Sequence, residues 1–442
     1  SKILKEFGVV ASINIVAIFL LSLLIIPIVY SFMKLPNKKH LKHLKNKSID
    51  YFVKWMENKV REKRINVYIV SLLGLIIGII GIYQIKISGS IIEDMPKSAP
   101  FFEDIRFFDQ SFNGIVPVEI WLDSKRENGI VKPATLKRMN ELQEVIGEYP
   151  ELAQPISVVN AVKFAKQAYY NGNPNYYSLP TTQENSFIYP YLSKANGDSQ
   201  LLSGYVDSTG QYGRITTFMQ DIETDRMEII EAELKKAITK IFPAERYGVN
   251  ITGKSLLFLK GTKYLINNLI LSLSLAILLI AFFMAYLFRS FKMILISLIP
   301  NLLPLIITAG VMGFAGIPLK PSTILVFSIA FGISVDDTIH FLAKYRQELI
   351  SNNWRIKQAV FAALRETGIS MFYTSVVLFF GFSVFLSSNF GGTQALGGLV
   401  AVTLLMAMLA NLILLPSLLI SLEDTISNDK VLKEPKIEIL DQ

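Results

Sequence analysis

The sequence has 442 residues, of which 51% are hydrophobic and only 18% are charged. This composition excludes an ordinary soluble globular protein and is typical of an integral membrane protein. The net charge of +8 does not indicate nucleic-acid binding, because the basic residues are concentrated between apolar runs. The lack of cysteine excludes disulfide bonds, thiol nucleophiles and cysteine-based metal sites.

Seven apolar runs have about the 20-residue length that a helix needs to cross a bilayer. A polar stretch from about residue 88 to 260 separates the second run from the third. The sequence therefore predicts a polytopic α-helical membrane protein with seven spans, at Val9–Tyr30, Val67–Tyr83, Leu265–Leu287, Ile294–Ala315, Pro321–Leu342, Ser370–Leu386 and Leu396–Ile420.

The basic loops predict the orientation of these helices. Lys and Arg residues gather between the first two spans, at Arg289 and Lys292, and between Lys344 and Arg365. Strict alternation puts these loops on one side, which the positive-inside rule makes cytoplasmic. The first basic tract can also contact anionic lipid headgroups. The predicted organisation is a membrane helix (1–32), a basic linker with an amphipathic helix (33–65), a membrane helix (66–87), an exported domain (88–260), three membrane helices (261–343), a cytoplasmic amphipathic linker (344–366), two membrane helices (367–421) and a cytoplasmic tail (422–442).

The exported region has the pattern of an α+β domain. Strand-like segments at Gly114–Leu122, Arg214–Met219 and Tyr247–Thr252 alternate with amphipathic helical segments at Pro133–Gly147 and Glu223–Ile241. Two strand–helix–strand passages favour a split βαβ, ferredoxin-like sandwich. A Tyr-rich loop at 168–196 either faces a ligand or packs against the sheet, and the packing interpretation is the simpler one.

The most informative motif lies inside the fifth predicted span. Asp336 and Asp337 are adjacent, and His340 follows within one helical turn, so its imidazole can reach either carboxylate. Acids at the centre of a bilayer cost roughly 2.5–3.5 kcal/mol each, and folding a hydrophobic helix does not require them. Such a coupled group titrates as a unit, which predicts an ion relay. A purely structural Asp–His pair is the alternative.

Polar groups in neighbouring spans can support this relay. Thr374 and Ser375 lie in the sixth span and Asn411 lies in the seventh. Their side chains can hydrogen-bond the acids, although Ser and Thr hydroxyls often bond to their own helix instead. Gly74 and Gly78 form a GxxxG pattern in the second span, which predicts close helix packing. The sequence predicts no metal site and no cofactor other than a proton or sodium gradient.

The first and last spans share a pattern. Each begins at a Phe-Gly or Leu-Gly pair, and a proline follows the glycine at the same distance in both spans, from Gly8 to Pro27 and from Gly397 to Pro416. Related helices at the two ends of a chain indicate a duplication, in which the first helix closes a repeat whose remainder is absent. This pattern predicts the C-terminal half of a longer protein. Chance similarity between two Leu/Ile-rich helices is the alternative.

Several motifs between about Gly253 and Leu422 resemble the resistance-nodulation-division (RND) superfamily, in its MMPL-like and predicted-exporter branch. This branch is related to hopanoid exporters and Patched-type sterol-sensing proteins. The motifs keep the family's order and spacing. They are Leu287-Phe-Arg-Ser-Phe291, Leu298-Ile-Pro-Asn-Leu-Leu-Pro304, Gly316-Ile-Pro-Leu319, the segment Gly332–Leu342 with Tyr345-Arg346, and Thr367-Gly368 with Thr374-Ser375.

The resemblance implies half of a twelve-helix, pseudo-symmetric fold with one periplasmic porter domain in the bacterial inner membrane. It implies export or inter-membrane transport of a hydrophobic or lipid substrate, driven by the proton-motive force, with the relay acids at Asp336 and Asp337. This sequence departs from the family in lacking an intramembrane lysine partner for these acids. The implied partners are the N-terminal half of the transporter and membrane lipids. A homo-oligomer and periplasmic partner proteins stay open, and no nucleic acid is implied.

Two other functions compete with transport. A lipid or sterol sensor, or a scaffold, can use the same fold without transport. An intramembrane aspartyl protease needs two carboxylates that meet face to face, and adjacent acids on one helix diverge by about 100°. The sequence therefore favours a secondary active transporter over an enzyme.

Overall fold

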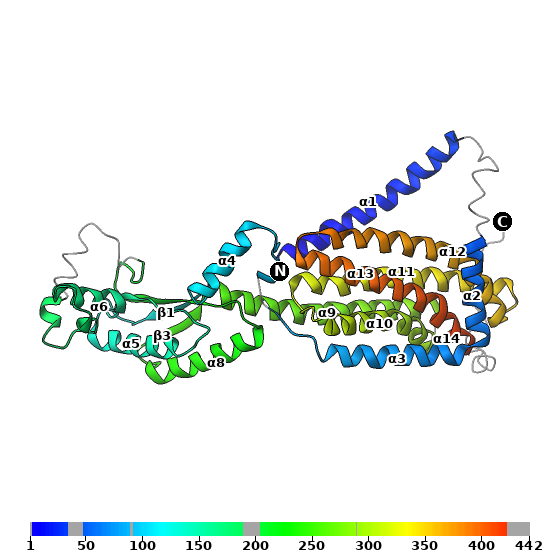
Figure 1. Cartoon of the computed structure of the whole chain (residues 1–442). Coiled ribbons are helices and arrows are strands. Elements are labelled where there is room, and N and C mark those ends of the chain that lie inside the picture. Colours follow the sequence, from blue (N-terminus) through cyan, green and yellow to red (C-terminus); the bar gives the residue numbers. More distant parts are fainter. Residues whose placement is uncertain (1, 34–46, 89–91, 189–203, 289, 422–442) are drawn as a thin grey trace.

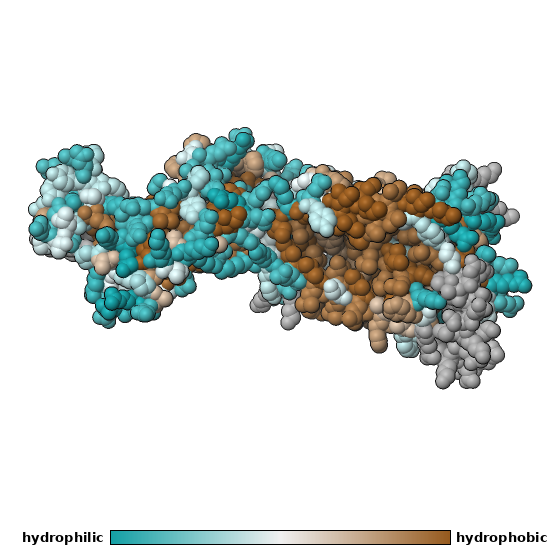
Figure 2. All heavy atoms as spheres, turned by 90° about the horizontal axis from the view of Figure 1, so that it is seen from below, coloured by the Kyte–Doolittle hydropathy of each residue, from teal (hydrophilic) through white to brown (hydrophobic). Residues whose placement is uncertain are grey.

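The computed structural model describes residues 2–33, 47–88, 92–188, 204–288 and 290–421. The molecule is elongated, with an α+β domain at one end and a bundle of long helices at the other (Figure 1). Space-filling atoms show a broad hydrophobic band over the helices, with hydrophilic residues at the far end and over the α+β domain (Figure 2). This distribution fits a bundle whose sides face lipid.

All seven predicted spans are confirmed as helices long and apolar enough to cross a membrane. Several extend beyond the apolar runs, because amphipathic segments continue the helix into the polar region. The helices are α1 (Lys2–Phe32), α3 (Arg64–Ile82), α9 (Lys254–Phe288), α10 (Phe291–Phe314), α11 (Pro321–Ser351), α12 (Ile356–Ser383) and a last span made of α13 (Gly391–Leu409), the π-helical turn η5 (Ala410–Leu414) and α14 (Leu415–Ser421).

The described spans differ in how deeply they are buried. In α10, in α11 and in the last span, at least half of the residues of the most apolar stretch are buried. These helices form the centre of the bundle. The first helix, α1, has no buried residue in its window and diverges from the bundle in Figure 1. The helix α11 therefore lies among neighbours on one side while part of its other side stays open.

Glycines allow α3 and α10 to pack closely. A Cβ atom at Gly81 would overlap the backbone of Gly310, and one at Gly313 would overlap the carbonyl oxygen of Gly81. Gly78 lies directly against Gly310, whereas Gly74 meets only the side chain of Ile307. The predicted glycine contact therefore exists, and it extends further along α3 than Gly74 and Gly78.

The domain outside the bundle is built on a three-stranded antiparallel sheet. The strands β1 (Val116–Asp123), β2 (Tyr212–Met219) and β3 (Gly248–Thr252) are arranged in the order β2-β1-β3. Residues 152 and 156 form isolated bridges with the outer edge of β2. Alternate side chains of β1 are buried, which explains the period-2 pattern of its sequence.

Among the described residues, three helices pack with this sheet. The helix α5 (Pro133–Gly147) has the predicted bounds, and α8 (Thr224–Ile241) begins one residue later than predicted. The sequence interpretation missed α6 (Val158–Tyr169), whose N-terminus is capped by the Ser157 hydroxyl. Buried residues of α5, α6 and α8 form one core with β1 and β2.

The described part of the Tyr-rich loop packs on itself. The rings of Tyr170 and Tyr176 stack at a centroid distance of 4.1 Å, and Tyr169 meets Tyr170 edge-on. Lys166 of α6 forms an ion pair of 2.9 Å with Glu184 in this loop. Tyr189 and Tyr191 of the predicted loop lie outside the described residues.

Two further helices flank the membrane spans. The amphipathic α2 (Lys47–Glu62) crosses the end of the bundle that is remote from the α+β domain (Figure 1). The helix α4 (Pro100–Ser111) lies between the domain and the bundle. The long α9 follows β3 through Gly253, whose positive φ of 110° allows the sharp turn.

Candidate functional site

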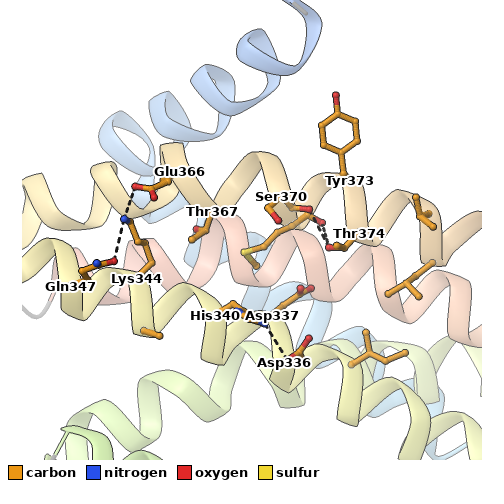
Figure 3. A pocket seen from close by; sticks show the side chains of 15 residues that line it. Asp336, Asp337, His340, Lys344, Gln347, Glu366, Thr367, Ser370, Tyr373 and Thr374 are labelled. Atoms are coloured by element: carbon orange, nitrogen blue, oxygen red, sulfur yellow. Dashed lines mark hydrogen bonds and ion pairs between the residues drawn. The ribbon is translucent and has the colours of Figure 1, made fainter. Parts of the chain in front are cut away.

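Asp336, Asp337 and His340 lie in the uninterrupted helix α11. The His340 Nε2 atom is 3.5 Å from the Asp336 Oδ1 atom, as the i, i+4 spacing predicts. The Asp336 side chain is 70% exposed and the His340 side chain is 72% exposed. Asp337 is half-buried on the side of α11 that faces α12 (Figure 3). The helix therefore presents its two acids in different directions.

All three residues line one open cavity of about 910 Å³ between α11 and α12. Thr367, Ser370 and Thr374 of α12 lie across the cavity from the acids, whereas the Tyr373 ring points away from them (Figure 3). A cavity of this size and polarity can hold water molecules, which carry protons between groups that do not touch. The arrangement can take up and release a cation or a proton between two membrane-spanning helices.

The two predicted support residues are placed differently. Thr374 lines the cavity, but its hydroxyl proton is directed to its own helix, where the carbonyl oxygens of Ser370 at 3.2 Å and Met371 at 3.0 Å are the alternative acceptors. Ser375 is buried and is not part of the cavity lining. The structure thus brings Thr374 but not Ser375 to the acids.

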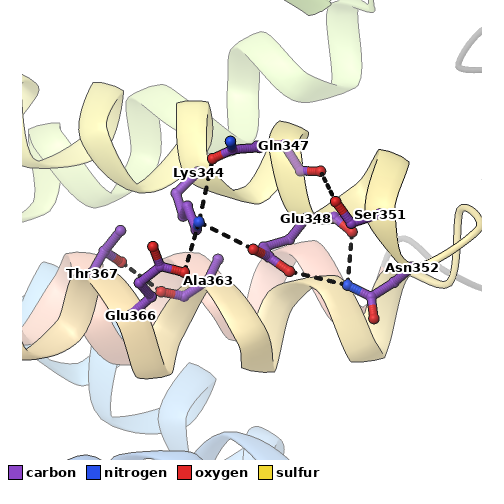
Figure 4. A network of polar contacts seen from close by, with 8 residues as sticks. All are labelled: Lys344, Gln347, Glu348, Ser351, Asn352, Ala363, Glu366 and Thr367. Atoms are coloured by element: carbon purple, nitrogen blue, oxygen red, sulfur yellow. Dashed lines mark hydrogen bonds and ion pairs between the residues drawn. The ribbon is translucent and has the colours of Figure 1, made fainter.

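A second ionisable cluster occupies one end of the same cavity, and the sequence interpretation missed it. The Lys344 Nζ atom is 2.6 Å from Glu366 of α12 and 3.1 Å from Glu348 of α11 (Figure 4). Lys344 follows His340 by four residues and Asp336 by eight, so all three share one face of α11. That spacing indicates from the sequence that Lys344 shares a face with Asp336 and His340. The approach of Glu366 depends instead on how α12 packs against α11.

A buried polar network lies on the opposite side of α11. The Asn301 Oδ1 atom of α10 accepts hydrogen bonds from Ser334 at 2.8 Å and Thr338 at 2.9 Å. The Thr338 hydroxyl is also 2.7 Å from the Asn411 Oδ1 atom, and the Asn411 amide donates to the Ser334 carbonyl oxygen at 3.1 Å. These four residues are buried.

The Thr338 hydroxyl carries a single proton, so it can donate to Asn301 or to Asn411 but not to both. Thr338 directly follows Asp337, and Asn411 lies in the π-helical turn η5. Single π-helical turns inside α-helices occur frequently at functional sites. The acidic segment of α11 is therefore tied to both α10 and the last span. Asn411 was noted from the sequence as an intramembrane polar residue, but its partner Asn301 was not.

The described residues contain no group of three or more His, Asp or Glu side chains placed to hold a metal ion.

The geometry defines a multi-pass helical membrane protein with an ionisable cavity inside its bundle. This class agrees with a comparison of the whole sequence. The model of the MMPL family matches residues 154–434, which is more than half of the chain, and the chain belongs to this family. The family indicates a membrane transporter of the RND type and not an enzyme.

One curated relative is a putative membrane protein of Methanocaldococcus jannaschii. The two sequences are 29% identical over 126 residues, which is 28% of this chain and 32% of the relative. The chain thus matches about a third of the relative's length.

Proposed function

We propose that the chain is the ion-coupling part of a secondary active transporter that exports a hydrophobic or lipid substrate, or moves it between membranes, at the expense of the proton-motive force. In this proposal, Asp336 and Asp337 bind and release the coupling proton, and His340 exchanges it with Asp336. The observation that supports it best is that both carboxylates belong to one membrane helix and line the same cavity. An acid in a membrane helix lowers stability, so its presence there supports a functional role.

The second cluster supplies one end of the proton path. Lys344 and Glu366 line the same cavity as His340, so water in the cavity can connect them to the aspartates. Protonation removes a charge from the cavity and changes which packing of α11 against α12 is preferred. Because Ser334 and Thr338 bind Asn301 and Asn411, a rotation of α11 would move α10 and the last span.

The exposed face of α11 supports the presence of further helices beyond those of this chain, as does the shared pattern of the first and last spans. Asp336 and His340 would face lipid if nothing covered them, and a charged group at the bilayer centre is costly. We propose that helices of a second half, in a twelve-helix arrangement, cover this face. A sensor or scaffold without transport would not need the cavity to reach both acids.

The proposal places α2 on the cytoplasmic side of the inner membrane and the α+β domain in the periplasm. The basic residues around α2 support this orientation through the positive-inside rule. The sheet order β2-β1-β3, with residues 152 and 156 beside β2, fits a ferredoxin-like porter domain.

Proton flux in inverted membrane vesicles from cells that express the chain tests the relay. An imposed pH gradient would be followed with a pH-sensitive dye for the wild type, Asp336→Asn and Asp337→Asn. We expect both variants to lose the flux, because an amide cannot carry the proton. Asp104→Asn is the matched control, since Asp104 lies in α4 outside the bundle.

Unchanged flux in both relay variants would overturn the proposed function. A flux that follows a sodium gradient and not a pH gradient would identify sodium as the coupling ion and would leave the proposed site unchanged. Absence of any gradient-driven flux in the wild type, together with retained lipid binding, would favour the sensor or scaffold.

A further inference from the structure

A second cavity, of about 410 Å³, opens at the end of the bundle that carries α2. Its walls come from α2, α3, α10 and the last span, which are in contact there. None of the residues that line it belongs to the relay cavity. It is therefore a separate site, and its chemistry differs from that of the relay.

Most of the lining of this cavity is apolar. Side chains of α3, α10 and the last span form it, among them Val67, Val70, Leu303, Ile307, Met406 and Ile413. The described residues contribute no acid to the lining. Val70 is largely exposed on the outer surface of α3, so the cavity communicates with the side of the bundle that faces lipid. A hydrocarbon chain can enter it without crossing the protein core.

The mouth of the cavity is polar and positively charged. Trp55 and Lys59 of α2, Lys63 and Asn66 surround it. The Lys59 ammonium group lies 5.6 Å from the centre of the Trp55 ring. Neither lysine has a carboxylate within ion-pair distance in the part of the chain that the structure describes. Two ammonium groups beside an apolar cavity match an anionic headgroup above acyl chains.

The tryptophan supports a membrane ligand over a water-soluble one. Tryptophan is enriched at the membrane–water interface, where its ring contacts acyl chains and its N–H stays in the polar layer. Trp55 lines the cavity together with Lys59, whose ammonium group lies over its ring. The lysine stems can also lie along acyl chains while their ammonium groups reach the phosphate.

The inner wall of the cavity includes Ala410, Ile413 and Leu414 of the π-helical turn η5. This turn holds Asn411, whose amide binds the α11 backbone beside the aspartates. An occupant of the cavity therefore touches the segment that is tied to α11, which distinguishes this cavity from ordinary lipid-facing surface.

We propose that this cavity is a binding site for an anionic phospholipid, with Lys59 and Lys63 on the phosphate and Trp55 beside the upper acyl chain. The lipid is a bound component of the protein and not the transported substrate. The site does not depend on proton coupling, and it requires only that the bundle lies in a membrane.

Quenching of Trp55 fluorescence by brominated lipids tests the site. The chain contains three tryptophans, so Trp121→Phe and Trp354→Phe leave Trp55 as the only reporter. This protein would be reconstituted into vesicles of phosphatidylcholine and phosphatidylglycerol, with the bromine atoms on either lipid in turn. We expect quenching by brominated phosphatidylglycerol to exceed its share of the bilayer.

Charge variants in the same background separate this site from general surface charge. Lys59→Gln with Lys63→Gln should lower the preference for phosphatidylglycerol about fivefold per lysine. Lys54→Gln is the matched control, because Lys54 is exposed on α2 but does not line the cavity. Ser71→Phe narrows the apolar part and should reduce quenching by either lipid without changing the headgroup charges.

Equal quenching by the two lipids in the reporter protein would overturn the proposal. An apolar protein segment would then be the alternative occupant of the cavity. An equal loss of preference in Lys54→Gln would also overturn it, because the effect would then come from the charge of the surface. Loss of proton flux in the aspartate variants has no bearing on these outcomes.

Discussion

Arg365 of α12 binds the Glu57 carboxylate of α2 with two hydrogen bonds, from Nε to Oε2 at 2.9 Å and from Nη2 to Oε1 at 2.7 Å. Arg61 of α2 adds a third, of 2.8 Å, to Oε1. Glu57 is buried, and its ion pair with Arg365 joins α2 to α12. This paired fork–fork contact fixes α2 across the end of the bundle.

Replacement of Glu57 by Gln should loosen α2. Arg365, followed by Arg61, holds the pKa of Glu57 below its usual range, so the carboxylate is charged at neutral pH. We expect Glu57→Gln to lower the free energy of unfolding by about 2 kcal/mol, because bonds to a charged acceptor are lost. Hydrogen exchange of α2 measures this.

The same clamp predicts a pH dependence. A carboxyl group whose pKa is lower in the folded state stabilises the protein above its unfolded pKa, and this stabilisation is lost as the pH falls through the folded value. Protection of α2 should therefore decrease on acidification below about 4.5. A pH-independent difference between wild type and Glu57→Gln would contradict the role of the charge.

The network behind the aspartates should be sensitive to a single hydroxyl. Thr338→Val keeps the shape of the side chain but leaves Asn301 and Asn411 without this partner. We expect a loss of roughly 1–3 kcal/mol in thermal unfolding, because buried polar atoms are left unpaired. Thr374→Val is the control, since its hydroxyl bonds only to its own helix. Equal effects in the two variants would contradict the network.

The glycine contact between α3 and α10 predicts a position-specific defect. Gly313→Ala would put a methyl group into the Gly81 carbonyl oxygen, and such overpacking typically costs about 1–3 kcal/mol. Gly381→Ala in α12 has open space around the added methyl group and should be neutral or stabilising. Melting temperatures in detergent compare the two. A neutral Gly313→Ala would show that the helices do not pack this closely.

The α+β domain should contain its own acid-sensitive contact. Glu184 is bound by Lys166 at 2.9 Å and by the Thr181 amide at 2.8 Å, and these partners lower its pKa to about 2. Its contribution to stability is complete above about pH 4.5 and should disappear as the pH falls towards about 2. Tyrosine near-UV circular dichroism during thermal unfolding follows this loss.

Glu184→Gln should be less stable than the wild type at neutral pH and should show a flatter pH dependence between about 4.5 and 2. Glu148→Gln is a suitable control, because Glu148 is an exposed acid at the end of α5. If the control flattens the profile as much as Glu184→Gln does, the Lys166 contact is not its cause.

Features that depend on local pattern were predictable. The seven spans follow from runs of apolar side chains, and α5 follows from a proline at its first position and a helical period of apolar residues. The pairing of Asp336 with His340 follows from their spacing on one helix. The helix α6 was missed, although the capping box formed by Ser157 and Asn160 marks its start.

Contacts between helices were not predictable in the same way. Spacing places a residue on a face of its own helix, but the rotation of that helix against its neighbours depends on all the packed side chains at once. Glu366 reaches Lys344, and Asn301 reaches Thr338, only because α12 and α10 pack against α11 in this orientation. Ser375 points away from the cavity for the same reason.

The sequence by itself determined that this is a membrane protein, where its helices run, and that Asp336, Asp337 and His340 share one turn of one helix, because hydropathy and periodicity are local properties of the chain. The tertiary structure decided that the two acids open into a cavity shared with Lys344 and Glu366. It also decided that a buried network connects their helix to the last span. Such arrangements arise from packing between segments far apart in the sequence, which no local pattern encodes.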